Sequence, residues 1–152
     1  MTPAAIAGMT RSPQLRESPD TAKRHLSAEA EFAMKRSTRT LRSITPRIVA
    51  EDSTALISFL REVFDATGDI REGAPAQMAI GDSNILISEA GERAAFPAFL
   101  YVYVKDVDAT YKKALRAGAV SVEEVWDTPY GDRRGMFSDR WKNVWQIAKR
   151  HA

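Results

Sequence analysis

The sequence of 152 residues contains no cysteine and only two histidines, and these shortages exclude several kinds of chemistry. Without cysteine the chain has no disulfide, no thiolate metal site and no cysteine nucleophile. The histidines, His25 and His151, lie near the two ends, so we expect no Ser-His-Asp triad in the segment between them. The eight glycines are scattered singly and form no phosphate-binding loop.

Long apolar runs are also missing. No stretch approaches the roughly 20 apolar residues that cross a bilayer, and the first residues lack the apolar segment of a secretory signal. We therefore expect a cytoplasmic protein that does not bind membranes. The 22 basic and 20 acidic residues give a formal charge of only +2, and 44% of the residues are hydrophobic. These values are typical of an ordinary globular domain.

Residues 1–43 differ in composition from the rest of the chain. They begin with prolines and small polar residues and contain eight basic and four acidic side chains, a net charge of +4. The remaining residues carry 14 basic and 16 acidic side chains, a net charge of −2. We predict a flexible or partly helical extension over 1–43 and a single domain over 44–150. An acidic domain gives no reason to expect nucleic-acid binding by its body.

From Ile44 onward two segments repeat the order strand, helix, strand, strand, strand. Residues 44–52 alternate like a strand, and residues 53–66 have the apolar spacing of a helix. Strand-like runs follow around 69–73, 77–82 and 84–90. The second segment predicts a strand ending at Asp106, a helix over 107–119 and strands over 121–127, 133–139 and 143–150. Asp52 and Asp106 are predicted helix caps. The predicted fold class is α+β.

The second segment carries the most specific motifs, YVKDVDATYKKALRAGA at 103–119 and TPYGDRRGMFSDRWKNVWQIA at 128–148. This pattern resembles the vicinal oxygen chelate superfamily, in its glyoxalase, bleomycin-resistance and PhnB-like branch. The resemblance implies paired βαβββ modules that form a curved mixed sheet around a cleft, with the helices on the outer face. The sequence departs from the family pattern at Asp65, Arg140 and Lys142, where Gly, Pro and Gly are usual.

Metal-using members of this superfamily bind a divalent ion in the cleft. The resemblance puts the four ligand positions at Thr45, Ile87 or Ser88, Phe99 and Gln146. Only Gln146 is a plausible ligand, because first-row metals favour imidazole and carboxylate. We therefore expect neither a metal nor another cofactor.

Side chains alternate between the two faces of a strand, which predicts the cleft residues. Leu100, Val102 and Val104 suit packing on a helix, and the intervening aromatic side chains would face the cleft. In the first strand Ile44, Pro46, Ile48 and Ala50 should pack on the helix. The predicted ligand-binding residues are Arg47, Phe99, Tyr101, Tyr103, Trp126, Tyr130 and Gln146. The alternative is that these rings fill a closed core and that Arg47 pairs with an acid.

The motif from Tyr130 to Arg134 has two interpretations. In the functional interpretation, Asp132 acts as an acid or base and Arg134 binds an anionic group. In the structural interpretation, the two residues stabilise the strand that follows Gly131. We favour the structural interpretation, with Tyr130 reaching the ligand.

The resulting prediction is a metal-independent protein that binds or sequesters an aromatic or anionic small molecule. The resemblance also implies a homodimer. It would have no catalytic residues. One alternative is a divalent-metal-dependent, glyoxalase-like lyase or dioxygenase. The other is a dimeric interaction module with a filled cleft.

Overall fold

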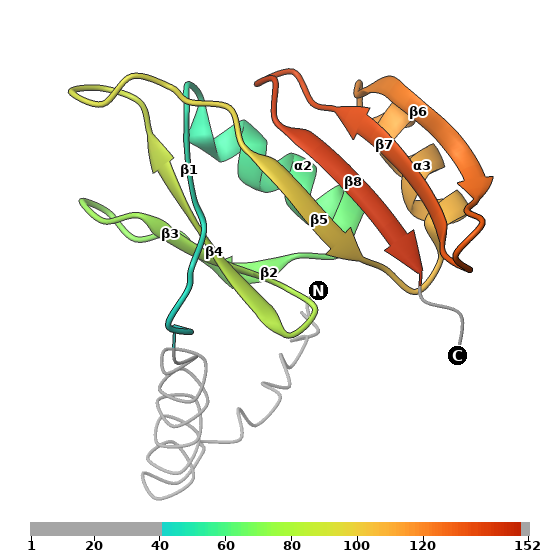
Figure 1. Ribbon diagram of the computed structural model, residues 1–152. Helices are drawn as coiled ribbons and strands as arrows, with labels where there is room; N and C mark the ends of the chain where they lie inside the picture. The colour runs from blue at the N-terminus through green and yellow to red at the C-terminus, as the bar shows by residue number, and fades with distance from the viewer. Residues whose placement is uncertain (1–40, 150–152) are drawn as a thin grey trace, which may run out of the picture. The chain divides into compact units, whose positions relative to one another are not determined.

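The computed structural model describes residues 41–149, and the repeated order of elements is visible in it (Figure 1). The predicted extension over 1–43 lies outside the described residues except for its last three positions, and so do both histidines. The first module contains β1 (Arg47–Ala50), α2 (Ser53–Phe64), β2 (Thr67–Asp69), β3 (Ala76–Ile80) and β4 (Ser83–Glu89). The second contains β5 (Phe99–Tyr103), α3 (Val107–Arg116), β6 (Val120–Asp127), β7 (Arg133–Ser138) and β8 (Val144–Lys149).

Each module forms one four-stranded mixed sheet. The strand orders are β1-β4-β3-β2 and β5-β8-β7-β6. In both, the first strand of the module lies parallel to the last, and the other neighbours are antiparallel. This architecture confirms the predicted α+β fold of paired βαβββ modules. Within one chain, however, the modules form two separate open sheets. Neither helix of the described residues is long and apolar enough to cross a membrane.

The two helices begin at the predicted aspartates. The carboxylate of Asp52 accepts a hydrogen bond from the backbone N–H of Ala55 at 3.2 Å, and Asp106 accepts one from Ala109 at 2.9 Å. Such side chains satisfy N–H groups that have no partner in the first helical turn. After α3, Gly118 adopts a φ of 92°, a backbone conformation that glycine accepts readily at the end of a helix.

Both helices and both sheets contribute to one hydrophobic core, and the helices cover one face of the second sheet (Figure 1). The apolar face predicted for α2 is buried, and Ile57 is buried beside it. The ring centroids of Phe64 and Trp145 are 5.0 Å apart, and those of Phe59 and Phe137 are 6.4 Å apart. The helix of the first module therefore packs on the sheet of the second. Aromatic pairs at these separations stabilise beyond their buried area.

Two sequence predictions in the first module are wrong. Ile44 and Pro46 are exposed because β1 begins only at Arg47, so neither packs on the helix. The strand predicted around 69–73 lies earlier, as β2, and Ile70 is exposed. Gly68 explains this shift: a Cβ there would lie 2.1 Å from the carbonyl oxygen of Gln77. Only glycine permits this approach of β2 to β3.

The turn between β7 and β8 is organised by the buried carboxylate of Asp139. One oxygen accepts hydrogen bonds from the backbone N–H groups of Trp141 and Asn143, both at 2.9 Å. The other accepts from the side chains of Asn143 and Trp145, also at 2.9 Å. The Asn143 side chain in turn accepts from the N–H of Ala98, immediately before β5. The network therefore connects β7, β8 and β5.

Replacement of Asp139 by Asn should lower the free energy of unfolding by roughly 3 kcal/mol. The reason is that the amide N–H₂ group would lie against N–H donors that now bind a carboxylate oxygen. Urea denaturation of the variant measures this loss. Asp69→Asn, on exposed β2, is the control and should change stability by less than about 0.5 kcal/mol. Equal stability of the two variants would contradict the role given to Asp139.

Asp65 and Lys142, where the family pattern has glycine, both adopt left-handed backbone conformations, with φ of 52° and 68°. Side chains destabilise this conformation, and lysine lacks the local hydrogen bonds that help aspartate to adopt it. Lys142→Gly should therefore stabilise the protein by about 1 kcal/mol in urea denaturation. Lys142→Ala removes the same side chain without relieving the backbone, so it should give no gain. If both variants gained similar stability, the gain would come from the loss of the lysine side chain and not from relief of the left-handed backbone.

Candidate functional site

The second sheet has one face on the helices and one face away from them, here called the open face. The alternation predicted for β5 is confirmed: Leu100 and Val102 pack against the core, whereas Phe99, Tyr101 and Tyr103 are 61%, 43% and 49% exposed. Register places Tyr101 opposite Gln146, and Gln146 opposite Met136. The open face includes the side chains of Phe99, Tyr101, Tyr103, Glu123, Trp126, Arg134, Met136, Ser138, Val144, Gln146 and Ala148.

Tyr101 and Tyr103 form an aromatic pair at the edge of the sheet. Their ring centroids are 5.1 Å apart with an interplanar angle of 49°. Partial burial raises the pKa of the Tyr101 phenol, and Tyr103, Asp132 and Tyr130 raise it further. These neighbours disfavour the phenolate, and a hydrogen bond between the Tyr101 and Tyr103 side chains contributes to the higher pKa.

The guanidinium of Arg134 is held by its neighbours on the open face. Its Nε and Nη2 donate to Glu123 Oε1 at 3.2 and 3.1 Å, and its Nη1 donates to the Tyr130 hydroxyl at 2.7 Å. The guanidinium carbon lies 5.4 Å from the ring centroid of Trp126, whose indole N–H donates to Glu123. These contacts raise the pKa of Arg134, chiefly through Glu123. Arg134 therefore braces the face, and its charge is balanced by Glu123.

Arg133 faces the opposite side of β7, as neighbouring residues of a strand do. Its Nε and Nη2 donate to the Asp108 carboxylate at 2.6 and 2.8 Å, and its Nη1 donates to Asp127 at 2.9 Å. The pKa of Asp108 is lowered, mainly by the hydrogen bonds from Arg133. Arg133 thus ties α3 to β6 and β7 and is remote from the open face.

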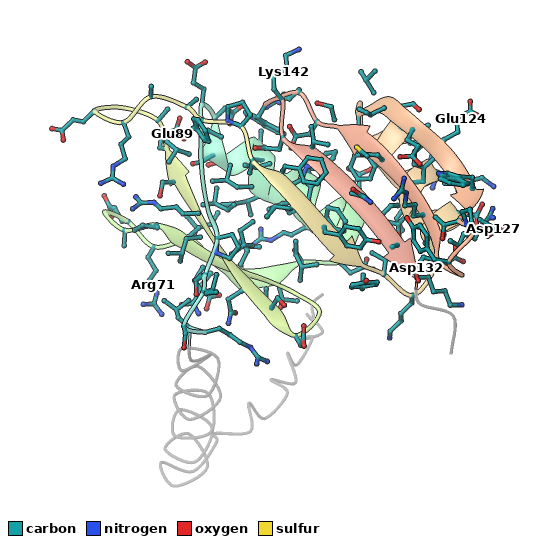
Figure 2. The ribbon with its side chains drawn as sticks, viewed as in Figure 1. Arg71, Glu89, Glu124, Asp127, Asp132 and Lys142 are labelled. Carbon is teal, nitrogen blue, oxygen red and sulfur yellow. The ribbon has the colours of Figure 1, made fainter. Side chains whose placement is uncertain are left out.

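Asp132 lies in the turn that connects β6 to β7 (Figure 2). Its backbone N–H donates to the Thr128 hydroxyl at 2.9 Å, and its carbonyl accepts from the Thr128 N–H at 2.8 Å. Its carboxylate makes no hydrogen bond or ion pair with any residue between 41 and 149. Asp132 therefore has no basic partner among residues 41–149, and its charge contributes to raising the pKa of Tyr101.

Arg47 lies apart from the other six predicted site residues, on β1 of the first sheet. Its Nε donates to the Ser88 hydroxyl at 2.8 Å. Both residues line a cavity of about 380 Å³ together with Ser53, Glu89 and the loop before β3. The Glu89 carboxylate accepts from the N–H groups of Asp52 and Ser53 at the start of α2. Its pKa is lowered, first by a hydrogen bond with the Ser53 side chain and then by these backbone contacts.

The four positions at which the resemblance implies metal ligands do not fit a divalent ion. The Thr45 hydroxyl donates to the carbonyl of Arg42, and the Ser88 hydroxyl already accepts from Arg47. Phe99 has no donor atom, and Gln146 lies on the other sheet from Ser88. Between residues 41 and 149 no three His, Cys, Asp or Glu side chains gather as a metal site. We therefore derive no chemical step through a metal.

Sequence analysis missed the contacts between Arg134, Glu123 and Trp126. The β6–β7 pairing shifts register between Ser121 and Glu123, and again between Glu123 and Trp126. Simple alternation along β6 fails at such bulges. The alternation of residues along β6 therefore could not predict that Glu123 pairs with Arg134.

Several proteins are similar to this chain in sequence. An uncharacterized protein of Mycobacterium bovis is 26% identical over 125 residues, which are 70% of this chain and 82% of that protein. An uncharacterized protein of Mycobacterium tuberculosis is also 26% identical over 125 residues, covering 70% of this chain and 74% of its own length.

Solved structures share the fold. TioX from Micromonospora sp. ML1 matches with a TM-score of 0.61 and 20% identity, covering 73% of this chain and 98% of TioX. A glyoxalase/bleomycin resistance protein/dioxygenase family enzyme from Burkholderia phytofirmans PsJN matches with a TM-score of 0.59 and 22% identity, covering 68% of this chain and 94% of that one.

The family model that matches the chain extends over residues 40–147, which include both modules except the last two residues of β8. Together with the paired βαβββ architecture, this match shows that the chain belongs to the Glyoxalase/Bleomycin resistance protein/Dioxygenase superfamily.

Proposed function

We propose that this chain binds or sequesters an aromatic small molecule on the open face of its second sheet, without a resident divalent metal. The observation that carries the proposal is the exposed aromatic set on and beside that face. Tyr101, Tyr103, Trp126 and Tyr130 are between 40% and 66% exposed, although large aromatic rings are usually buried. Exposed apolar patches of this kind mark surfaces that bind a ligand or partner.

The polar groups around these rings are suited to orienting a ligand. The Tyr130 hydroxyl accepts from Arg134, which leaves its own proton for donation to a ligand. Gln146 is only 8% exposed between Tyr101 and Met136, so it offers an amide at the base of the face. A mostly aromatic surface with a few polar groups is typical of small-molecule sites.

The lack of a suitable donor set among residues 41–149 supports binding without a metal. Thr45 and Ser88 use their hydroxyls elsewhere, and Phe99 offers no lone pair. Arg134 and Glu123 satisfy one another, so we assign neither an acid–base role. The proposal therefore includes no catalytic residue.

We further propose a homodimer that covers the open face. On one chain the rings of β5 remain exposed along an edge strand, which is an arrangement that soluble proteins generally cover or charge. A second copy would turn the open face into a cleft between two sheets. The ligand would then be bound at the shared interface.

A double substitution of Tyr101 and Tyr103 by Ala should weaken ligand binding at least tenfold, because the main stacking surface is lost. A thermal-shift screen of antibiotics and aromatic acids supplies the ligand, and calorimetry then measures its affinity for both proteins. Ile70→Ala, an exposed apolar truncation in the first module, is the control and should leave the affinity unchanged.

Unchanged affinity in the double variant would contradict the proposed surface. Stoichiometric Mn, Fe, Ni or Zn in the purified protein, with activity that depends on it, would instead favour the lyase or dioxygenase. A dimer that binds nothing in the screen would favour the interaction module.

Light scattering after size-exclusion chromatography should give twice the mass of one chain, which is 16.9 kDa. Phe99→Asp should shift the protein toward the monomer, since it places a charge among apolar contacts of the covered face. Leu115→Lys introduces a charge on the exposed side of α3 and should leave the mass unchanged. A monomeric parent protein at micromolar concentration would refute the proposed dimer.

A further inference from the structure

We propose that the ligand of the open face is an uncharged aromatic compound with a carboxamide or lactam group, which pairs with the side-chain amide of Gln146. This inference rests on the proposed function, because it gives the chemical class of the ligand bound at the same surface. Gln146 lies on β8, between β5 and β7 in the second sheet (Figure 1).

The side chain of Gln146 is buried but has no partner in the described part of the chain. The residue is only 8% exposed, and its amide makes no hydrogen bond with any residue between 41 and 149. Both amide atoms are nevertheless accessible to solvent. Burying a polar group without a hydrogen bond costs free energy, and native proteins rarely do so. The amide therefore needs a partner from outside the described residues.

The strand register directs the Gln146 amide to the open face. Its chain neighbours Trp145 and Ile147 are fully buried in the core, and side chains alternate between the faces of a strand. The residue opposite Gln146 on β5 is Tyr101, whose side chain is 43% exposed on the open face. The amide thus lies at the base of the aromatic surface on which the ligand is proposed to bind.

The immediate surroundings of Gln146 favour an uncharged ligand. On its own strand the next residues of the open face are Val144 and Ala148, and on the adjacent strands it lies opposite Tyr101 and Met136. All four have uncharged side chains. The amide is therefore a neutral polar group in a largely apolar setting.

The ionic groups of the open face satisfy one another. Glu123 and Arg134 form an ion pair at 3.1 Å in which both side chains are about three-quarters buried. A further donor of Arg134 is directed to the Tyr130 hydroxyl at 2.7 Å. A charged ligand group placed over Gln146 would lose hydration without gaining one of these side chains as a counter-ion, and such a loss is costly. An uncharged group loses much less.

The chemistry of the amide defines the group that fits it. A glutamine side chain presents an acceptor oxygen and a donor N–H₂ side by side in one plane. A ligand group that also has a donor beside an acceptor can form two hydrogen bonds with it, as glutamine does with the edge of adenine. Carboxamides and lactams have this arrangement. A ketone supplies only an acceptor, and a carboxylate is an acceptor that also carries charge.

Three probes with the same phenyl ring separate the polar group from the ring: benzamide, acetophenone and benzoate. Each is titrated into the full-length protein and followed by protein chemical shifts, which measure affinities down to the millimolar range. Benzamide should bind roughly fivefold more tightly than acetophenone, because it forms one more hydrogen bond. It should bind roughly tenfold more tightly than benzoate, because the carboxylate also loses its hydration.

Gln146→Met keeps the length of the side chain and removes both polar atoms, so it should abolish the preference for benzamide over acetophenone. The fold should survive, because an apolar side chain replaces an amide that has no partner among residues 41–149. The urea midpoint of the unliganded variant should therefore not fall. Met136→Leu, opposite Gln146 on β7, is the matched control and should retain the full preference.

The outcomes separate this inference from the proposed function. If acetophenone or benzoate binds as tightly as benzamide, or if Gln146→Met keeps the preference, the ligand class is wrong while aromatic binding stands. The same holds if no probe binds although a screened compound loses affinity in the Tyr101 and Tyr103 double variant.

Two further results would also overturn the inference. A lower urea midpoint and a loss of the dimer in Gln146→Met would show that the second copy uses the amide. If no probe binds, and the Tyr101 and Tyr103 double variant behaves like the parent with every screened compound, both proposals fail.

Discussion

The open face depends on a group that lies outside it, the buried carboxylate of Asp139. Its four hydrogen bonds fix the β7–β8 turn and the indole of Trp145, which packs on α2. Through Asn143 the same network reaches the N–H of Ala98 and sets where β5 begins beside β8. Because a one-residue slip would turn every side chain to the other face, this turn determines that Tyr101 lies opposite Gln146.

Two adjacent arginines show how one strand serves both the fold and the site. Arg133 points to the helix side, where Asp108 and Asp127 bind it, and joins α3 to the sheet. Arg134 points to the open face, where Glu123 neutralises it and Tyr130 receives its remaining donor. Only this division leaves the Asp132 carboxylate without a basic partner among the described residues. The charge of the candidate site therefore follows from pairings on both sides of β7.

Much of the fold was predictable because its signals are local. Aspartate caps, the apolar face of α2 and alternation along β5 each depend on neighbours within a few residues. Predictions failed where a distant contact determined the outcome. Ile44 has a suitable residue type for a strand but lies before β1, and the position of β2 depends on the approach of Gly68 to Gln77.

The sequence by itself determined the superfamily resemblance, the order of elements and which side chains of β5 share a face. Those properties follow from residue spacing, which a chain carries before it folds. Only the tertiary structure decided that Arg47 lies on a separate sheet from the tyrosines, and that Arg134 pairs with Glu123. The physical reason is that ion pairs require contact across strands, and the bulges of β6 set that register.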